Sequence, residues 1–254
     1  MPLPQTPSFR LDGRRALVAG ASSGIGRAAA VALAQAGARV TLLARQADNL
    51  VLLQSEMRAE GLEADYLALD ICDTAKMEST LAAQAPYEIL VNSAGLARHS
   101  PALQTIESDY DAVTNVNVKA AYFLTRAVAK SLVGTQRSGS LINVSSQMGL
   151  VGGIDRAVYC ATKHALEGMT KAMAVEWGPH KIRVNTLCPT FTRTPLAEQT
   201  LSIPARRKWI EDQIKLGRIA EVEDLMGAVV FLASDAAAMM TGTSLLIDGG
   251  WTAS

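Results

Sequence analysis

From Arg15 almost to the end of the chain, short apolar runs alternate with longer stretches of helical periodicity. The apolar runs are residues 16–19, 40–44, 66–69, 89–91, 141–144, 182–187 and 244–247. The helical stretches lie near residues 25–36, 46–60, 74–84, 106–133, 158–177 and 221–233. Such alternation predicts βαβ units, and continuous apolar runs are typical of parallel strands that are buried on both faces. We therefore expect an α/β fold: a doubly wound, Rossmann-type parallel sheet with helices on both faces.

The same pattern predicts the domain organisation. Residues 1–10, rich in Pro, Ser and Thr, are expected to form a flexible arm, and residues 11–254 a single domain. Residues 190–220 interrupt the alternation with a helical piece near 204–214. Because ligands bind at the carboxyl ends of such strands, this excursion is predicted to be a substrate lid.

Composition excludes several classes of protein. Lys+Arg and Asp+Glu both number 24, so the net charge of zero argues against nucleic-acid binding. No apolar run approaches the roughly 18 residues of a membrane span. Three cysteines without a CxxC pair fit a reducing cytoplasm. The three histidines lack metal-ligand spacing, so no metal is expected.

The first apolar run leads into a glycine-rich turn, Gly20-Ala21-Ser22-Ser23-Gly24-Ile25-Gly26, that opens a helical stretch. Glycine permits a positive φ and lets a ligand approach the backbone closely. Free N–H groups at a helix start attract a pyrophosphate. A glycine cluster alone is a weak signal, but its place between strand and helix predicts a dinucleotide site rather than an ordinary turn.

The end of the second predicted strand indicates which dinucleotide binds. NAD-preferring sites carry Asp or Glu there, which binds the ribose hydroxyls. This chain has Ala44 followed by Arg45, and a guanidinium can pair with the 2′-phosphate of NADP. We expect NADP(H) to be preferred, with NAD(H) as the other possible cofactor and a solvent-facing Arg45 as the competing interpretation.

Tyr159 and Lys163 are four residues apart at the start of a predicted helix, so they share one helix face. A phenol titrates near pH ~10, and a nearby ammonium lowers that pKa. Such a tyrosine can exchange a proton with a carbonyl or alcohol oxygen. The pair therefore predicts acid–base catalysis by Tyr159.

Together these motifs resemble those of the short-chain dehydrogenase/reductase family, in its classical subgroup, from about Leu11 to Gly250. The resemblance also rests on Asp70, on Asn92-Ser93-Ala94-Gly95, on Asn117, on Ser146 and on Pro189-Thr190 with Thr194. Three positions depart from the family pattern: Ala19 replaces Thr, Ser93 replaces Asn and Thr190 replaces Gly. Because Thr190 replaces the family's glycine, the sequence does not determine the backbone conformation beside the nicotinamide.

The resemblance implies a catalytic tetrad of Asn117, Ser146, Tyr159 and Lys163. Ser146 would hold the substrate oxygen near Tyr159, Lys163 would bind the nicotinamide ribose, and Asn117 would hold a water that links Lys163 to solvent. The nicotinamide would exchange a hydride with the substrate carbon. The implied cofactor-binding residues are Gly20, Ser22, Ser23, Gly24, Ile25, Gly26, Arg45, Asp70, Ile71, Asn92, Ala94, Gly95, Tyr159, Lys163, Pro189, Thr192 and Thr194.

The resemblance further implies an NAD(P)-dependent oxidoreductase that interconverts a carbonyl and a secondary alcohol, on a ketose, polyol or sugar acid. It also implies a homotetramer with an interface formed by the 106–133 and 158–177 helices. The predicted substrate residues are Ser146, Gln147, Met148, Arg156 and Phe191, with His99, Leu196 and Trp209 as further candidates. The basic run at residues 206–208 is expected to be solvated, with contact to an anionic substrate as the alternative.

Two other functions stay open. One is 3-oxoacyl-[acyl-carrier-protein] reduction, for which Arg137 and Lys181 are the candidate contacts to the acidic carrier. The other is an inactive dinucleotide-binding regulatory protein, because a fold does not imply an activity. The presence of all four tetrad residues favours an enzyme over the regulatory protein.

Overall fold

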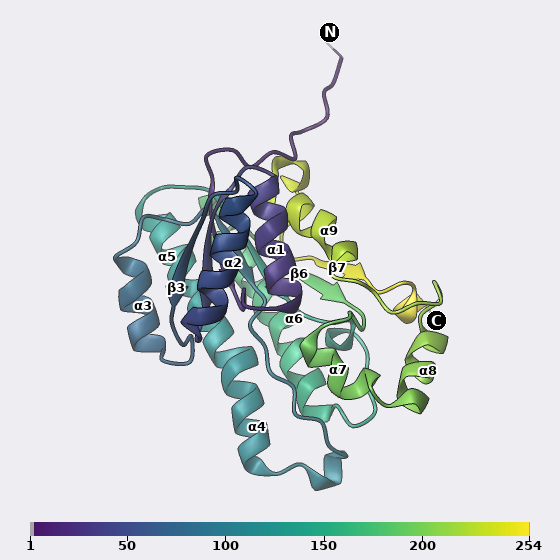
Figure 1. Ribbon diagram of the computed structural model, residues 1–254. Helices are drawn as coiled ribbons and strands as arrows, with labels where there is room; N and C mark the ends of the chain where they lie inside the picture. The colour runs from purple at the N-terminus through teal and green to yellow at the C-terminus, as the bar shows by residue number, and fades with distance from the viewer. Residues whose placement is uncertain (1–2, 254) are drawn as a thin grey trace.

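Seven parallel strands form one sheet in the order β3-β2-β1-β4-β5-β6-β7, with helices against both faces (Figure 1). This computed structural model describes residues 3–253, so residues 1–2 of the expected arm and residue 254 lie outside it. The strands are β1(Arg15–Ala19), β2(Arg39–Ala44), β3(Ala64–Ala68), β4(Ile89–Asn92), β5(Gly139–Val144), β6(Ile182–Pro189) and β7(Ser244–Ile247). The helices are α1(Gly24–Gln35), α2(Ala47–Ala59), α3(Thr74–Ala82), α4(Glu107–Thr114), α5(Ala121–Gly134), α6(Ala157–Trp177), α7(Pro195–Leu201), α8(Pro204–Gln213) and α9(Glu223–Ala233). The predicted doubly wound α/β fold is confirmed.

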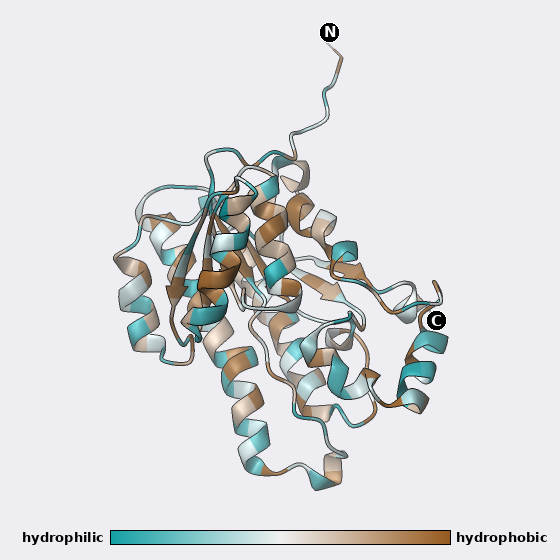
Figure 2. Ribbon diagram, in the orientation of Figure 1, coloured by the Kyte–Doolittle hydropathy of each residue, from teal (hydrophilic) through white to brown (hydrophobic). Residues whose placement is uncertain are grey.

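Alternation along β1 explains why both faces of the sheet are covered. Ala16 and Val18 belong to a buried apolar cluster with α1, α2 and α9. Leu17 and Ala19 point to the opposite face and belong to a second cluster with α3, α5 and α6. Residues 16–19 of β1 are therefore covered on both faces of the sheet, which is why the apolar run there is continuous. Figure 2 shows hydrophobic residues along the strands of the sheet.

The expected helix at 106–133 differs from a single regular helix. It consists of α4 and α5 joined by a π-helical turn over Asn115–Ala120. The third strand also begins and ends earlier than expected, at Ala64 and Ala68. Tyr66 is exposed on this edge strand. Because an edge strand also contains exposed residues, the apolar run alone did not predict where β3 begins and ends.

The strand order creates a crevice beside β1. The chain passes from β1 to β2 and β3 on one side, and then crosses to β4 on the other side. At such a switch point the two connections leave the sheet in opposite directions, which opens space above the carboxyl ends of the strands. The glycine-rich turn after β1 and the segment after β4 both lie there.

Residues 190–220 form a small substructure that contains both α7 and α8. A bridge between Thr192 and Ala220 closes its base. Leu201, Ile210 and Ile214 form part of an apolar cluster of its own, whereas the outer surface of α8 is hydrophilic (Figure 2). Helix α8 matches the expected helical piece, and α7 was not predicted.

The chain before β1 is exposed from residue 3 to residue 10. Phe9 nevertheless contacts Phe231 of α9, with ring centroids 6.3 Å apart. Within residues 3–253, the helices are all too short or too polar to cross a membrane.

Candidate active site

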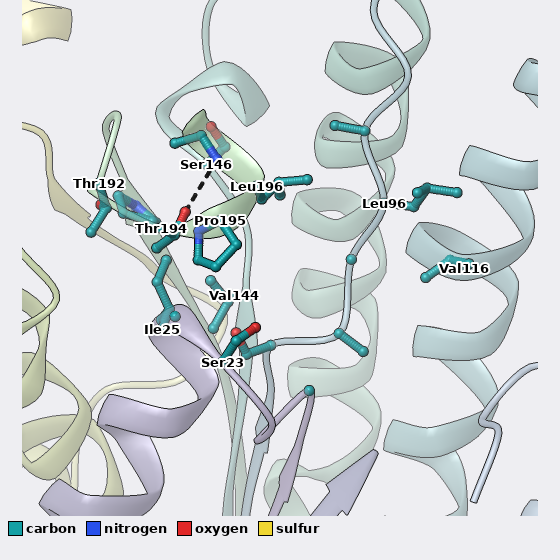
Figure 3. A pocket seen from close by; sticks show the side chains of 18 of the residues that line it. Ser23, Ile25, Leu96, Val116, Val144, Ser146, Thr192, Thr194, Pro195 and Leu196 are labelled. Carbon is teal, nitrogen blue, oxygen red and sulfur yellow. Dashed lines mark hydrogen bonds between the residues drawn. The ribbon is translucent and has the colours of Figure 1, made fainter. Parts of the chain in front are cut away.

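A cavity of about 450 Å³ opens at the carboxyl ends of the strands and is lined by both predicted motifs. Its walls include the glycine-rich turn at one end and Ser146, Tyr159 and Lys163 at the other. Figure 3 shows Ser23 and Ile25 facing Thr192 and Thr194 across the cavity. This volume lies within the range of ligand sites, roughly 300–1,000 Å³.

Close packing explains the glycines of the turn. Gly20 has a φ of 75°, and a Cβ added there would lie 2.8 Å from the backbone nitrogen of Ala94. A Cβ on Gly26 would lie 2.2 Å from the carbonyl oxygen of Gly20. The turn can therefore pack against α1 and the segment directly after β4 only with glycine at these positions.

The start of α1 fits the pyrophosphate of a dinucleotide. Ser23 is the N-cap residue, and its side chain makes no capping hydrogen bond. The N–H groups of the first turn thus lack a side-chain cap at a helix end that lines the cavity, where the helix dipole favours an anion. Gly24 allows Thr194 to lie close to this helix end, because a Cβ at residue 24 would be only 3.0 Å from Cγ2 of Thr194.

Two side chains from the ends of β2 and β3 line the far end of the cavity. Arg45 is exposed and lines the cavity directly after β2. Asp70 is also exposed, and its Oδ1 accepts a hydrogen bond from the Cys72 backbone at 2.9 Å. Arg45 thus lies where a 2′-phosphate on the adenine ribose would be recognised.

A buried polar network supports the segment after β4. The Asn92 amide donates to Oδ1 of Asn143 at 3.3 Å, and its own Oδ1 accepts from the Ala94 nitrogen at 3.3 Å. Thr125 of α5 donates to the same Asn143 oxygen at 3.2 Å. These bonds tie β4, β5 and α5 together and fix the backbone beside the cavity.

Asn117 lies within the π-helical turn between α4 and α5. Its Oδ1 accepts from the Leu96 nitrogen at 2.8 Å, and its Nδ2 donates to the Leu96 oxygen at 2.9 Å and to Oγ1 of Thr162 at 3.1 Å. Asn117 therefore binds the loop after β4 to α6. Single-turn π-helices are frequent at functional sites.

Ser146, Tyr159 and Lys163 meet at the carboxyl end of β5. The Ser146 hydroxyl accepts from the Met148 nitrogen at 3.1 Å and donates to Oε1 of Gln147 at 2.9 Å. Lys163 Nζ donates to the Val144 oxygen at 2.8 Å and lies 5.6 Å from the centre of the Tyr159 ring. A serine, a phenol and an ammonium group thus line the same end of the cavity.

The pKa values at this end are governed by burial. Burial lowers the pKa of Lys163 to about 8, against a smaller opposing effect of Cys188 and Glu167. Burial raises the pKa of the Tyr159 phenol, while Ser146 and the charge of Arg156 act in the opposite direction. The Tyr159 pKa is therefore not lowered as expected, because desolvation of the phenolate outweighs the Ser146 hydrogen bond and the charge of Arg156.

The segment after β6 covers the cavity from the side of α7. Thr192 Oγ1 donates to the Thr190 oxygen at 3.0 Å, and the Thr194 hydroxyl caps α7 by accepting from the Ala197 nitrogen at 3.3 Å. Thr190 replaces the expected glycine without a positive φ. The backbone path there thus needs no glycine.

Polar and aromatic side chains line the substrate end. His99 packs edge-on against Tyr159, with ring centroids 5.8 Å apart. Arg156 lies over the Phe191 ring, and Phe191 stacks on Trp251. Trp209 does not line the cavity as expected, because its ring packs against Trp251 on the outer side.

Most of the predicted residues line the cavity, but Trp209 and three others do not. Gly26, Asn92 and Asn117 support its walls from behind. The sequence analysis missed Leu96, Val116 and Thr200, which also line it. Leu96 and Val116 adjoin motif residues, so proximity could have indicated them, whereas Thr200 lies on the unpredicted α7. Among the described residues, the acidic, His and Cys side chains form no cluster that could hold a metal ion.

Known proteins resemble this chain over nearly its whole length. The family model described as Enoyl-(Acyl carrier protein) reductase matches residues 20–252. D-erythrulose reductase from Gallus gallus is 43% identical over 248 residues, covering 98% of this chain and 99% of its own. L-xylulose reductase from Bos taurus is 42% identical over 245 residues, covering 96% of this chain and 99% of its own.

A solved structure extends the similarity to three dimensions. Gluconate 5-dehydrogenase from Burkholderia cenocepacia, in complex with NADP and tartrate, superposes with a TM-score of 0.93 at 33% sequence identity. The match covers 97% of this chain and 98% of the other.

Proposed function

Because the chain belongs to the classical short-chain dehydrogenase/reductase family, we propose that it interconverts a carbonyl and a secondary alcohol on a ketose, polyol or sugar acid, with NADP(H). The observation that carries the proposal is one cavity lined at one end by the glycine-rich turn and at the other by Ser146, Tyr159 and Lys163. Relatives named for D-erythrulose, L-xylulose and gluconate support the sugar substrate class. The NADP in the related gluconate 5-dehydrogenase supports the cofactor.

In the reductive direction, Tyr159 donates its phenolic proton to the carbonyl oxygen. Ser146 holds that oxygen by hydrogen bonding, and the Gln147 contact at 2.9 Å orients the serine hydroxyl. The bound nicotinamide supplies the hydride to the carbonyl carbon. Lys163 places its ammonium group beside the phenol, with Nζ 5.6 Å from the centre of the Tyr159 ring. Asn117 acts as a positioning residue, because it joins the loop after β4 to Thr162 of α6.

The Tyr159→Phe variant tests this assignment. Reduction of D-erythrulose, L-xylulose, 5-keto-D-gluconate and an acetoacetyl thioester is followed with NADPH and NADH. Loss of the general acid should lower kcat by about 10²- to 10⁴-fold, while the Kd for NADPH stays within about twofold because the proton contributes little to dinucleotide binding. Tyr66→Phe, which removes an exposed phenol on β3, is the control. Activity above a tenth of wild type in Tyr159→Phe would contradict the role.

We also propose a preference for NADP(H) that depends on Arg45. A charge-assisted bond to the 2′-phosphate contributes about 1.5–3 kcal/mol, which corresponds to about ten- to a hundredfold in kcat/KM. Arg45→Ala should remove the preference, and Ala44→Asp should reverse it by repelling the phosphate. Arg39→Ala, which removes an exposed guanidinium at the other end of β2, is the control. An NADH preference in the wild-type enzyme would overturn the assignment.

The alternative of acyl-carrier-protein reduction receives less support from the fold. Its two candidate contacts, Arg137 and Lys181, precede β5 and β6 and so lie at the amino ends of the strands. The cavity opens at the carboxyl ends. Arg137 is also paired with Glu88. A high kcat/KM for the acetoacetyl thioester in the panel would restore this alternative.

Further proposals concern the whole protein. We propose that residues 11–254 act as one domain after an N-terminal arm, with residues 190–220 as the substrate lid.

We propose a homotetramer, since α4, α5 and α6 expose the apolar side chains of Tyr110, Tyr122 and Val175. Light scattering measures the mass of the assembly in solution, which should be four times that of one chain. The free thiols of the three cysteines support a cytoplasmic location.

A further inference from the structure

Arg156 is a buried arginine at the substrate end of the cavity, three residues before Tyr159. It exposes 7% of its surface. Towards the described residues it donates one hydrogen bond, from Nη2 to Oγ1 of Thr200 at 3.2 Å, and its Cζ lies 5.2 Å from the centre of the Phe191 ring. A guanidinium has five N–H donors. Most of the hydrogen-bonding capacity of Arg156 is thus available to a ligand.

A comparison with Arg183 indicates that this arrangement is not structural. Arg183 of β6 is partly buried, and its guanidinium donates to the backbone oxygens of three residues: Leu232, Ser234 and Met240. Arg156 has no such set of carbonyl acceptors, and among residues 3–253 it forms none of the ion pairs. Burying an unpaired charge is unfavourable, so the placement of Arg156 indicates an anionic ligand.

The neighbouring acid is turned away from Arg156. Asp155 has a left-handed φ of 59°, an unfavourable conformation for most side chains. Its carboxylate pairs with Arg206 on α8 at 3.0 Å. The turn therefore places the Asp155–Arg206 ion pair away from the cavity, while Arg156 lines the cavity.

Two further polar groups surround the same space. Gln147 exposes 1% of its surface; Ser146 holds its Oε1, and its Nε2 has no partner among the described residues. The buried Nδ1 of His99 also lacks a described partner. Burial, followed by the charge of Arg156, lowers the pKa of His99 to about 4, so this imidazole is neutral at pH 7. Arg156 thus supplies the positive charge beside two neutral hydrogen-bonding groups.

We propose that Arg156 binds the carboxylate of a sugar-acid substrate, while Gln147 and His99 bind its hydroxyl groups. The planar guanidinium matches a carboxylate with two parallel hydrogen bonds. The proposal rests on the proposed function and narrows its substrate class from ketoses, polyols and sugar acids to sugar acids. It also makes Arg156, rather than the basic run at 206–208, the group that recognises the anion.

A different role for Arg156 predicts a different result. Its charge also lowers the pKa of Tyr159, and a purely electrostatic effect on the acid would act on every substrate equally. Carboxylate binding acts only on substrates that carry the carboxylate. A matched pair of substrates separates the two roles.

The pair is 5-keto-D-gluconate and L-sorbose. They differ at one terminal carbon, which is a carboxylate in 5-keto-D-gluconate and a hydroxymethyl group in L-sorbose. With NADPH at pH 7, Arg156→Gln should lower kcat/KM for the keto acid by about 10- to 100-fold, the value of one charge-assisted bond. The loss should appear mainly in KM and should exceed the loss for L-sorbose by at least about tenfold. Arg156→Lys should restore part of it. Equal losses on both substrates would overturn the proposal.

Arg206→Gln is the matched control, because it removes the neighbouring guanidinium that is exposed and already paired with Asp155. It should leave the discrimination between the two substrates within about threefold. If Arg206→Gln removes the discrimination and Arg156→Gln does not, the anion is recognised on α8 and the proposal is wrong. Thermal melts of each variant confirm that it is folded.

Calorimetry tests binding without turnover. The enzyme–NADPH complex is titrated with D-gluconate and with D-glucitol, which are alcohols and so cannot be reduced. Tighter binding of D-gluconate that is lost in Arg156→Gln supports the proposal, and equal binding of the two ligands overturns it. Failure of the proposed function is distinct: the wild-type enzyme would then reduce none of the carbonyl compounds in the panel, whatever the calorimetry gives.

Discussion

Lys163 holds a charge in surroundings that disfavour it. The side chain is buried, and burial lowers its pKa from 10.5 to about 8. One helical turn further along α6, Glu167 accepts hydrogen bonds from Thr186 and Ser244 and partly offsets the effect on Lys163. The folded chain therefore keeps this ammonium beside Tyr159 at the expense of folding stability, a cost that is common at functional sites.

The Lys163→Met variant should be inactive and more stable than wild type at pH 7. A pKa lowered from 10.5 to about 8 corresponds to roughly 3 kcal/mol at 1.36 kcal/mol per pH unit. The lost hydrogen bond to Val144 reduces the expected gain to about 1–3 kcal/mol. Urea unfolding at one fixed protein concentration measures it.

The pH dependence of this gain has a definite sign. Below about pH 8 both folded and unfolded wild-type chains carry the lysine proton, so the full cost of burying the charge is present. Between about 8 and 10.5 the unfolded chain binds more protons, and this group makes the wild type more stable as pH rises. The difference between variant and wild type should therefore shrink from pH 7 to pH 9.5. A constant difference would show that packing, not charge, causes it.

At the scale of elements, the sequence predicted what depends on burial and local spacing. Continuous apolar runs predicted all seven strands, because the inner strands are covered by helices on both faces. The edge strands β3 and β7 are less buried. The glycine-rich turn was predictable because it lies directly between β1 and α1. The spacing of Tyr159 and Lys163 on α6 was equally local.

The elements that were missed depend on contacts distant in the sequence. The π-helical turn at 115–120 accompanies the bonding of Asn117 to Leu96 and Thr162, residues 21 and 45 positions away. The bounds of residues 190–220 depend on the bridge between Thr192 and Ala220. Such pairings leave no periodic signal in the chain, so neither α7 nor the place of Trp209 was predictable.

The contact between α1 and the glycine-rich turn is open to a direct test. Gly26→Ala places a methyl group 2.2 Å from the Gly20 oxygen by ideal geometry, so α1 must shift. We expect a loss of about 1–3 kcal/mol, as for other overpacked sites, together with weaker NADPH binding. Gly227 is exposed on α9, where an added Cβ meets nothing within 4 Å, so Gly227→Ala should be stabilising by about 1 kcal/mol. Equal effects of the two substitutions would contradict the packing role of Gly26.

At the scale of the whole molecule, the site joins parts of the chain that are far apart in sequence. Its cofactor end belongs to β1, β2 and β3, whereas its substrate end belongs to β5, α6 and residues 190–220. The two parts meet where Gly24 lies beside Thr194. A dinucleotide that binds along the cavity would contact both parts, so its binding energy should stabilise the folded chain as a unit.

NADPH should therefore raise the melting temperature of the whole protein. At a free concentration of about 100 times its Kd, a ligand that binds only the folded state adds about 2.7 kcal/mol. For a chain of this size each kcal/mol raises Tm by about 2–4 °C, so the expected shift is about 5–10 °C. Scanning calorimetry with NADPH and with NADH at equal concentration measures it, and NADH should give the smaller shift because it lacks the phosphate that Arg45 would bind. A shift below about 2 °C, at an NADPH concentration shown by titration to be 100 times Kd, would mean that the two ends of the site unfold independently.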